Sequence, residues 1–125
     1  MPKKILLVDD TLTIIALEKL ILGEKYEYVV ARNGKEGCDA ARRASPDLIL
    51  MDLNMPVQNG LDALKSLKAD PATAKIPVVI VTTRGEPTSV EQCRAAGCVE
   101  FVSKPIESQL LVSTVTRLLE GEFDG

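Results

Sequence analysis

Five polar residues each stand just after a short apolar run of the sequence. They are Asp9 and Asp10 after ILLV, Asp52 after LILM, Thr82 after VVIV, and Lys104 two residues after VEFV. Each type has an ordinary structural role by itself, since Asp begins helices and Thr is common in strands. If the apolar runs are parallel strands, however, their carboxyl ends meet at the edge of the sheet where ligands bind. Three carboxylates, a hydroxyl and an ammonium would therefore lie together at this edge of the sheet, which predicts a functional site.

Three neighbouring carboxylates constrain the chemistry of this predicted site. Two carboxylates about 4 Å apart repel by about 1 kcal/mol in water and several-fold more in a partly buried cleft. Such a cluster needs a cation, and oxygen ligands with open positions suit Mg²⁺, which retains water and often bridges to a phosphate. Asp52 carries a carboxylate oxygen that can act as a nucleophile and form an aspartyl phosphate. Lys104 and Thr82 would then bind the phosphoryl oxygens, because phosphoryl transfer depends on positioning and charge stabilisation.

The composition limits the classes of function. The chain has 125 residues, 46 % of them hydrophobic and 26 % charged, with a net charge of −3, which indicates one globular domain and argues against nucleic-acid binding. No apolar run reaches the roughly 18 residues of a membrane span, and the N-terminal segment is too short for a signal peptide. We therefore expect a cytoplasmic protein without a membrane segment. Histidine is absent and the three cysteines form no CxxC pair, which excludes histidine-based catalysis and most zinc sites.

Short apolar runs alternate with longer segments of helical periodicity. We expect strands at 5–8, 28–31, 48–51, 78–81 and 99–102, and helices at 12–22, 35–44, 60–69, 88–96 and 107–120. This alternation predicts an α/β fold with helices on both faces of a parallel sheet, namely a flavodoxin-like (βα)5 doubly wound sandwich of strand order 2-1-3-4-5. The second and fifth runs adjoin or contain polar residues and are the predicted edge strands. One domain is expected over 1–120, with a tail at 121–125.

Four motifs in this order resemble the receiver domains of two-component response regulators. They are VDD (8–10), DLILMDLNMPVQNG (47–60), VVIVTT (78–83) and AAGCVEFVSKP (95–105), and the resemblance covers nearly the whole chain. It implies that Asp52 accepts a phosphoryl group. It also implies that Mg²⁺ is bound directly by Asp10, largely through water by Asp9, and by Asp52 and the backbone carbonyl of Asn54.

The resemblance assigns roles to further residues. Thr82 would bond the phosphoryl group and, with Phe101, form the family's switch pair, while Lys104 would neutralise the phosphoryl charge. The bond before Pro105 would be cis. Asn54 and Arg84 occupy positions that tune the lifetime of the phosphoryl group in this family, and the residue types do not decide in which direction.

The resemblance also implies partners. A sensor histidine kinase or a histidine phosphotransfer protein would supply the phosphoryl group. The output would be a contact with a target protein through the last two helices and the strand between them, residues 87–119. We expect a stand-alone, monomeric receiver, because no effector segment follows the last helix.

Three other functions are less consistent with the residues. A phosphatase of the haloacid dehalogenase type would carry a DxD motif after its first strand, whereas the nucleophile-like Asp52 follows the third run. A flavodoxin-like cofactor-binding module would need a phosphate loop after the first strand, where Asp9 and Asp10 would repel the phosphate. A degenerate receiver that takes no phosphate would not retain all of the site residues.

Overall fold

The computed structural model describes residues 2–53, 59–83 and 87–120, apart from the side chains of residues 83 and 87–89. Within these ranges five strands alternate with five helices. The elements are β1 (Lys4–Val8), α1 (Leu12–Leu22), β2 (Glu27–Ala31), α2 (Gly34–Ala44), β3 (Leu48–Asp52), α3 (Gly60–Ala69), β4 (Val78–Thr83), α4 (Pro87–Ala96), β5 (Glu100–Lys104) and α5 (Ser108–Glu120).

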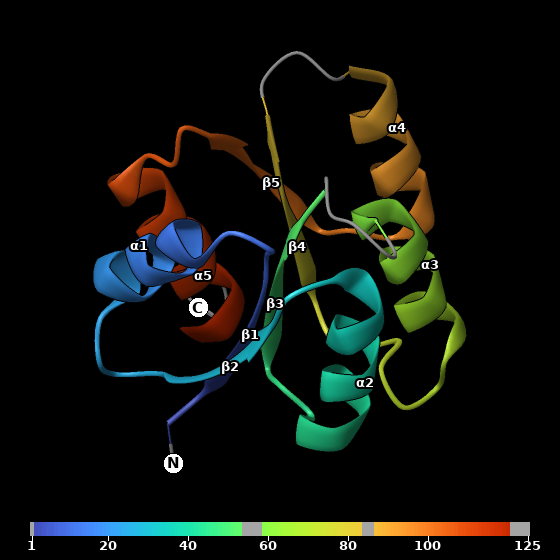
Figure 1. The fold of residues 1–125 in the computed structure, drawn as a ribbon, viewed down its shortest axis with the longest axis horizontal. Coiled ribbons are helices and arrows are strands. Elements are labelled where there is room, and N and C mark those ends of the chain that lie inside the picture. Colours follow the sequence, from blue (N-terminus) through green and yellow to red (C-terminus); the bar gives the residue numbers. More distant parts are fainter. Residues whose placement is uncertain (1, 54–58, 84–86, 121–125) are drawn as a thin grey trace.

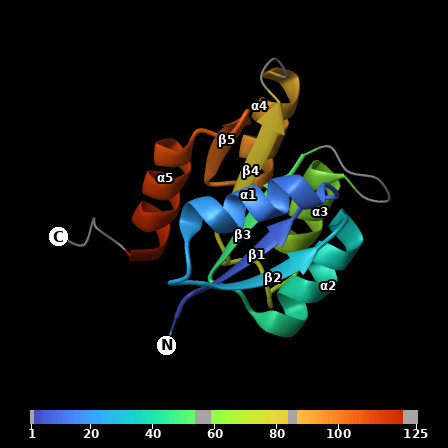
Figure 2. The same ribbon diagram turned by 60° about the vertical axis from the view of Figure 1, so that its left-hand side comes forward.

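The five strands form one parallel sheet between two layers of helices. The strand order is β2-β1-β3-β4-β5, which confirms the predicted order and places β2 and β5 at the edges. Helices α1 and α5 cover one face, and α2, α3 and α4 cover the other (Figures 1 and 2). None of the helices in the described ranges has the length and apolar character that crossing a membrane requires.

The sheet divides the core into two clusters. Ile5 and Leu7 belong to the cluster on the α1–α5 side, whereas Leu6 and Val8 belong to the cluster on the α2–α4 side. All four side chains are at most 1 % exposed, because successive residues of a strand point to opposite faces and both faces are covered. The three cysteines are buried and free.

The strands end where backbone pairing with the neighbouring strand ends, and not where the apolar run of the sequence ends. The strand expected at 99–102 runs over Glu100–Lys104, so it extends into polar residues. Ser103 is paired with Thr82 in the ladder and Lys104 is paired with Thr83. Backbone hydrogen bonding therefore continues past the last apolar residue, and it carries Lys104 to the end of the sheet. The helix expected from residue 88 begins at Pro87, a residue type favoured at the first helical position.

Gly60 joins α3 closely to the end of β3. Its N–H donates to the carbonyl oxygen of Leu53 over 2.9 Å. A Cβ atom at this position would lie 2.5 Å from the carbonyl oxygen of Asp52 and 2.8 Å from the Cα of Leu53. Both of these are backbone atoms, which cannot move without displacing the strand end that carries the Asp52 side chain.

We expect Gly60→Ala to lower the free energy of unfolding by about 1–3 kcal/mol, the usual loss from overpacking. Helix propensity alone predicts the opposite sign, because alanine is favoured over glycine in a helix by about 1 kcal/mol. Urea unfolding measures the difference, and Ser66→Ala on the exposed side of α3 is a control for propensity alone. A Gly60→Ala protein as stable as the wild type would show that the end of β3 leaves room for a Cβ atom at position 60.

Candidate phosphorylation and metal site

Strand alternation places three charged side chains on one face of the sheet. Asp9 follows Ile5 and Leu7 at intervals of two, and its N–H donates to the carbonyl oxygen of Ala31 over 3.0 Å, so the strand geometry extends through it. Asp52 follows Leu48 and Leu50, and Lys104 follows Val102, in the same way. Because these apolar residues all belong to the core cluster on the α1–α5 side, Asp9, Asp52 and Lys104 project toward that side.

The Lys104 ammonium lies between two buried carboxylates. Lys104 Nζ donates to Asp52 Oδ1 over 3.1 Å and lies 3.9 Å from Asp9 Oδ2. The Asp9 and Asp52 side chains are 2 % and 4 % exposed, so both carboxylates are shielded from water. Attraction between opposite charges is strong in such a setting. The edge strand β5 thereby supplies the positive charge that the carboxyl ends of β1 and β3 lack.

Asp9 is only partly stabilised by its surroundings. Its Oδ1 accepts a hydrogen bond from the N–H of Thr11 over 2.9 Å, but its buried Oδ2 has no hydrogen-bond partner among the described residues. Burial raises the pKa of Asp9, and the negative charge of Asp52 adds to the rise, while the Thr11 N–H opposes it. The Lys104 ammonium, 3.9 Å from Oδ2, also opposes the rise in the Asp9 pKa, but it makes no hydrogen bond to this oxygen.

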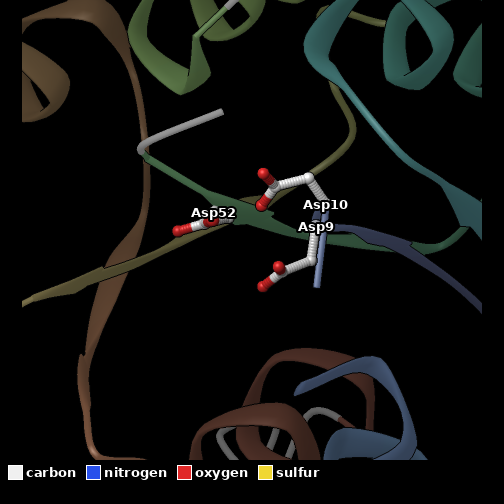
Figure 3. Close-up of side chains that lie close together, drawn as sticks. All are labelled: Asp9, Asp10 and Asp52. Carbon is white, nitrogen blue, oxygen red and sulfur yellow. The ribbon is translucent and has the colours of Figure 1, made fainter. Parts of the chain in front are cut away.

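The site fits a divalent cation. Asp9, Asp10 and Asp52 each offer an oxygen within 4.8 Å of the others, and the three side chains gather at the ends of β1 and β3 (Figure 3). Three carboxylates against one ammonium leave two negative charges in excess, and the buried Asp9 Oδ2 accepts no hydrogen bond from the residues that the structure describes. An all-oxygen set of this kind, with Asp10 exposed, suits Mg²⁺, which retains part of its water shell.

The residues named for switching lie on the other side of the sheet. Thr82 is buried and follows Val78 and Ile80 of the α2–α4 cluster, against which the half-buried Phe101 also packs. The Arg94 guanidinium of α4 lies over the Phe101 ring at 5.0 Å from its centroid. The Lys104–Pro105 peptide bond is cis. Asn54 and Arg84, the two lifetime-tuning positions, lie outside the described residues.

Sequence reasoning missed two residues near the site. The Arg32 guanidinium donates to the carbonyl oxygen of Asp10 over 3.0 Å, and Glu18 of α1 is buried with only 2 % exposure. Burial raises the pKa of Glu18 to about 8, the negative charges of Asp9 and Asp52 add to the rise, and the positive charge of Lys104 opposes it. The sequence contains one signal for the burial of Glu18, which is its helical spacing with the apolar residues Ile15 and Leu22. A glutamate on the apolar side of a helix is carried into the core with its neighbours.

Comparisons with known proteins identify a family and a relative. The model of the response regulator receiver domain matches residues 5–116. The chain is 38 % identical over 120 residues to the polar-differentiation response regulator DivK of Brucella anthropi, and the match covers 95 % of this chain and 98 % of that protein.

Solved structures show the same fold. The chemotaxis response regulator CheY4 of Vibrio cholerae matches with a TM-score of 0.87 and 29 % identity, over 95 % of this chain and 100 % of that one. The receiver domain of the sensor histidine kinase PA1611 from Pseudomonas aeruginosa PAO1 matches with a TM-score of 0.84 and 27 % identity, over 96 % and 99 % of the two chains. That structure has a magnesium ion coordinated in its active site cleft. The chain therefore belongs to the response regulator receiver domains, the phosphorylation-activated signalling switches of two-component systems.

Proposed function

We propose that Asp52 accepts the phosphoryl group in this receiver. The observation that carries the proposal is the ion pair between Lys104 Nζ and Asp52 Oδ1 at 3.1 Å, next to two further carboxylates at the same sheet edge. A structural ion pair needs one carboxylate for one ammonium. The additional acids destabilise the resting site by mutual repulsion, and they are explained by a bound cation.

The transfer uses an oxygen of Asp52 as the nucleophile. This oxygen forms a bond to the phosphorus atom of a phosphohistidine, and the bond from phosphorus to the donor's imidazole nitrogen breaks, so the phosphoryl group moves without any oxidation or reduction. Lys104, already within hydrogen-bonding distance, stabilises the phosphoryl oxygens, and the Thr82 hydroxyl bonds another of them. These are the positioning and charge effects on which phosphoryl transfer depends.

Asp10, Asp9 and Asp52 would hold Mg²⁺, together with the backbone carbonyl of Asn54, a residue outside the described ranges. A bound Mg²⁺ supplies positive charge that offsets the excess of carboxylates and the incoming phosphoryl group. Asp10 is the exposed member of the set and can reach the ion at little desolvation cost. Arg32, which donates to the carbonyl oxygen of Asp10, holds the backbone there in place.

The output is a change in protein–protein affinity. The phosphoryl donor is a sensor histidine kinase or a phosphotransfer protein, and the target binds the face formed by α4, β5 and α5. A groove on this face is lined by Glu100, Phe101, Leu110, Ser113 and Arg117, with an ion pair of 2.9 Å between Arg117 and Glu100. A rotation of Phe101 would change the shape of this groove. The protein acts in the cytoplasm as a monomer.

The acceptor is tested by replacing Asp52. Acetyl phosphate with Mg²⁺ should add one phosphoryl group to the wild type, seen by intact-mass spectrometry, and Asp52→Asn should abolish the addition because an amide oxygen is a poor nucleophile. Asp62→Asn, which makes the same substitution at an exposed position of α3, is the matched control and should be labelled as the wild type is. Undiminished labelling of Asp52→Asn would refute the assignment.

The path from site to surface is tested at Thr82 and Phe101. Beryllofluoride, a mimic of the phosphoryl group, should shift the side-chain NMR signals of Phe101 in the wild type, because Thr82 moves toward the bound group and leaves room for the ring. A ligand shifts such an equilibrium only by its differential affinity for the two states, so Thr82→Ala should bind the mimic but lose most of the shift. Unchanged Phe101 signals in the wild type would contradict the coupling.

A further inference from the structure

Glu18 is an unusual residue for the interior of a helix–sheet interface. It lies in α1 between Ile15 and Leu22, which both pack in the core cluster on the α1–α5 side. Glu18 is 2 % exposed, and its Oε1 is buried without a hydrogen-bond partner in the part of the chain that the structure describes. Burying a carboxyl group without a partner is strongly unfavourable. An apolar side chain would suit this position better if packing were its only role.

The Glu18 carboxyl group faces the layer that contains the phosphorylation site. Asp9, Asp52 and Lys104 project from the ends of their strands toward the α1–α5 side, and the buried stripe of α1 faces the same layer. Burial raises the pKa of Glu18 to about 8, the negative charges of Asp9 and Asp52 add to the rise, and the positive charge of Lys104 opposes it. The stripe of α1 that carries Glu18 therefore lies on the same side of the sheet as the three charged residues at the strand ends.

Two partnerless buried oxygens belong to this one group of residues. Asp9 Oδ2 and Glu18 Oε1 are the buried side-chain oxygens that lack a hydrogen-bond partner within the described ranges. Neither of these oxygens is hydrogen-bonded to the other. Water molecules that remain bound to Mg²⁺ are strong hydrogen-bond donors. A carboxyl oxygen just outside the first coordination shell can accept a hydrogen bond from one of them.

We propose that Glu18 is a positioning residue of the Mg²⁺ site, whose carboxylate accepts a hydrogen bond from a metal-bound water on the side of Asp9. This role rests on the proposed function of the site and adds a fourth carboxylate to it. Glu18 lies outside the group whose oxygens approach within 4.8 Å of one another, which fits contact through water. The residue then raises the affinity for Mg²⁺ at the expense of the stability of the metal-free protein.

The test is the dissociation constant for Mg²⁺, measured by isothermal titration calorimetry on the unphosphorylated full chain. Glu18→Leu removes the acceptor oxygens and should weaken binding about tenfold, the lower part of the range for residues that support metal ligands. Glu18→Gln keeps an acceptor oxygen and should lose less affinity. Glu24→Gln makes the same amide substitution at an exposed position just after α1 and should bind as the wild type does.

Unfolding in the presence of a chelator separates this role from a purely structural one. Glu18→Leu should be at least as stable as the wild type without metal, because an unpartnered carboxyl group is removed from the core. Wild-type affinity for Mg²⁺ in Glu18→Leu would overturn the role of Glu18 and leave the proposed function intact. A wild-type protein that binds no Mg²⁺ would instead contradict the proposed function itself.

Discussion

The shortage of positive charge among buried carboxylates governs this structure. Lys104 pairs with Asp52 at 3.1 Å and reaches Asp9 only at 3.9 Å, so one ammonium is shared by two buried acids, and Asp10 adds a third carboxylate beside them. Removing ions from water is costly, and the cost is recovered only when each charge is well paired. The fold keeps this arrangement because the apolar residues of β1, β3 and β4 are fully buried, which stabilises the sheet independently of the site.

The sheet also separates the residues proposed for phosphoryl transfer from those proposed for signalling. Asp9, Asp52 and Lys104 follow the strand residues that face α1 and α5, whereas Thr82 follows those that face α2 to α4 and lies on the same side as Phe101. A group bound at the strand ends can contact both sets, since it sits at the edge between the two faces. The alternation of strand side chains therefore places the charged site and the aromatic residue near the proposed output surface on opposite faces that meet at the strand ends.

The fold was predictable because its strongest signals are local. Continuous apolar runs indicated strands covered on both faces, and the polar residues after them converge wherever parallel strands end. The end of β5 at Lys104 was not predicted, since pairing with β4 extends the strand through polar residues. The burial of Glu18 and the contact of Arg94 with Phe101 depend on how helices pack on the sheet. The helical spacing of Glu18 with Ile15 and Leu22 was a signal for the first of these, whereas no spacing in the sequence indicates the second.

The central claim is that a divalent cation relieves the repulsion among these carboxylates, and the Mg²⁺ dependence of stability in Asp10→Asn tests it most directly. A ligand that binds only the folded protein raises its free energy of unfolding. The wild type should therefore gain about 2.7 kcal/mol when the Mg²⁺ concentration is a hundred times the dissociation constant. Asp10→Asn should be equally or more stable without metal, because one repelling charge is removed, and should gain much less from Mg²⁺. An equal gain in both proteins would contradict the account.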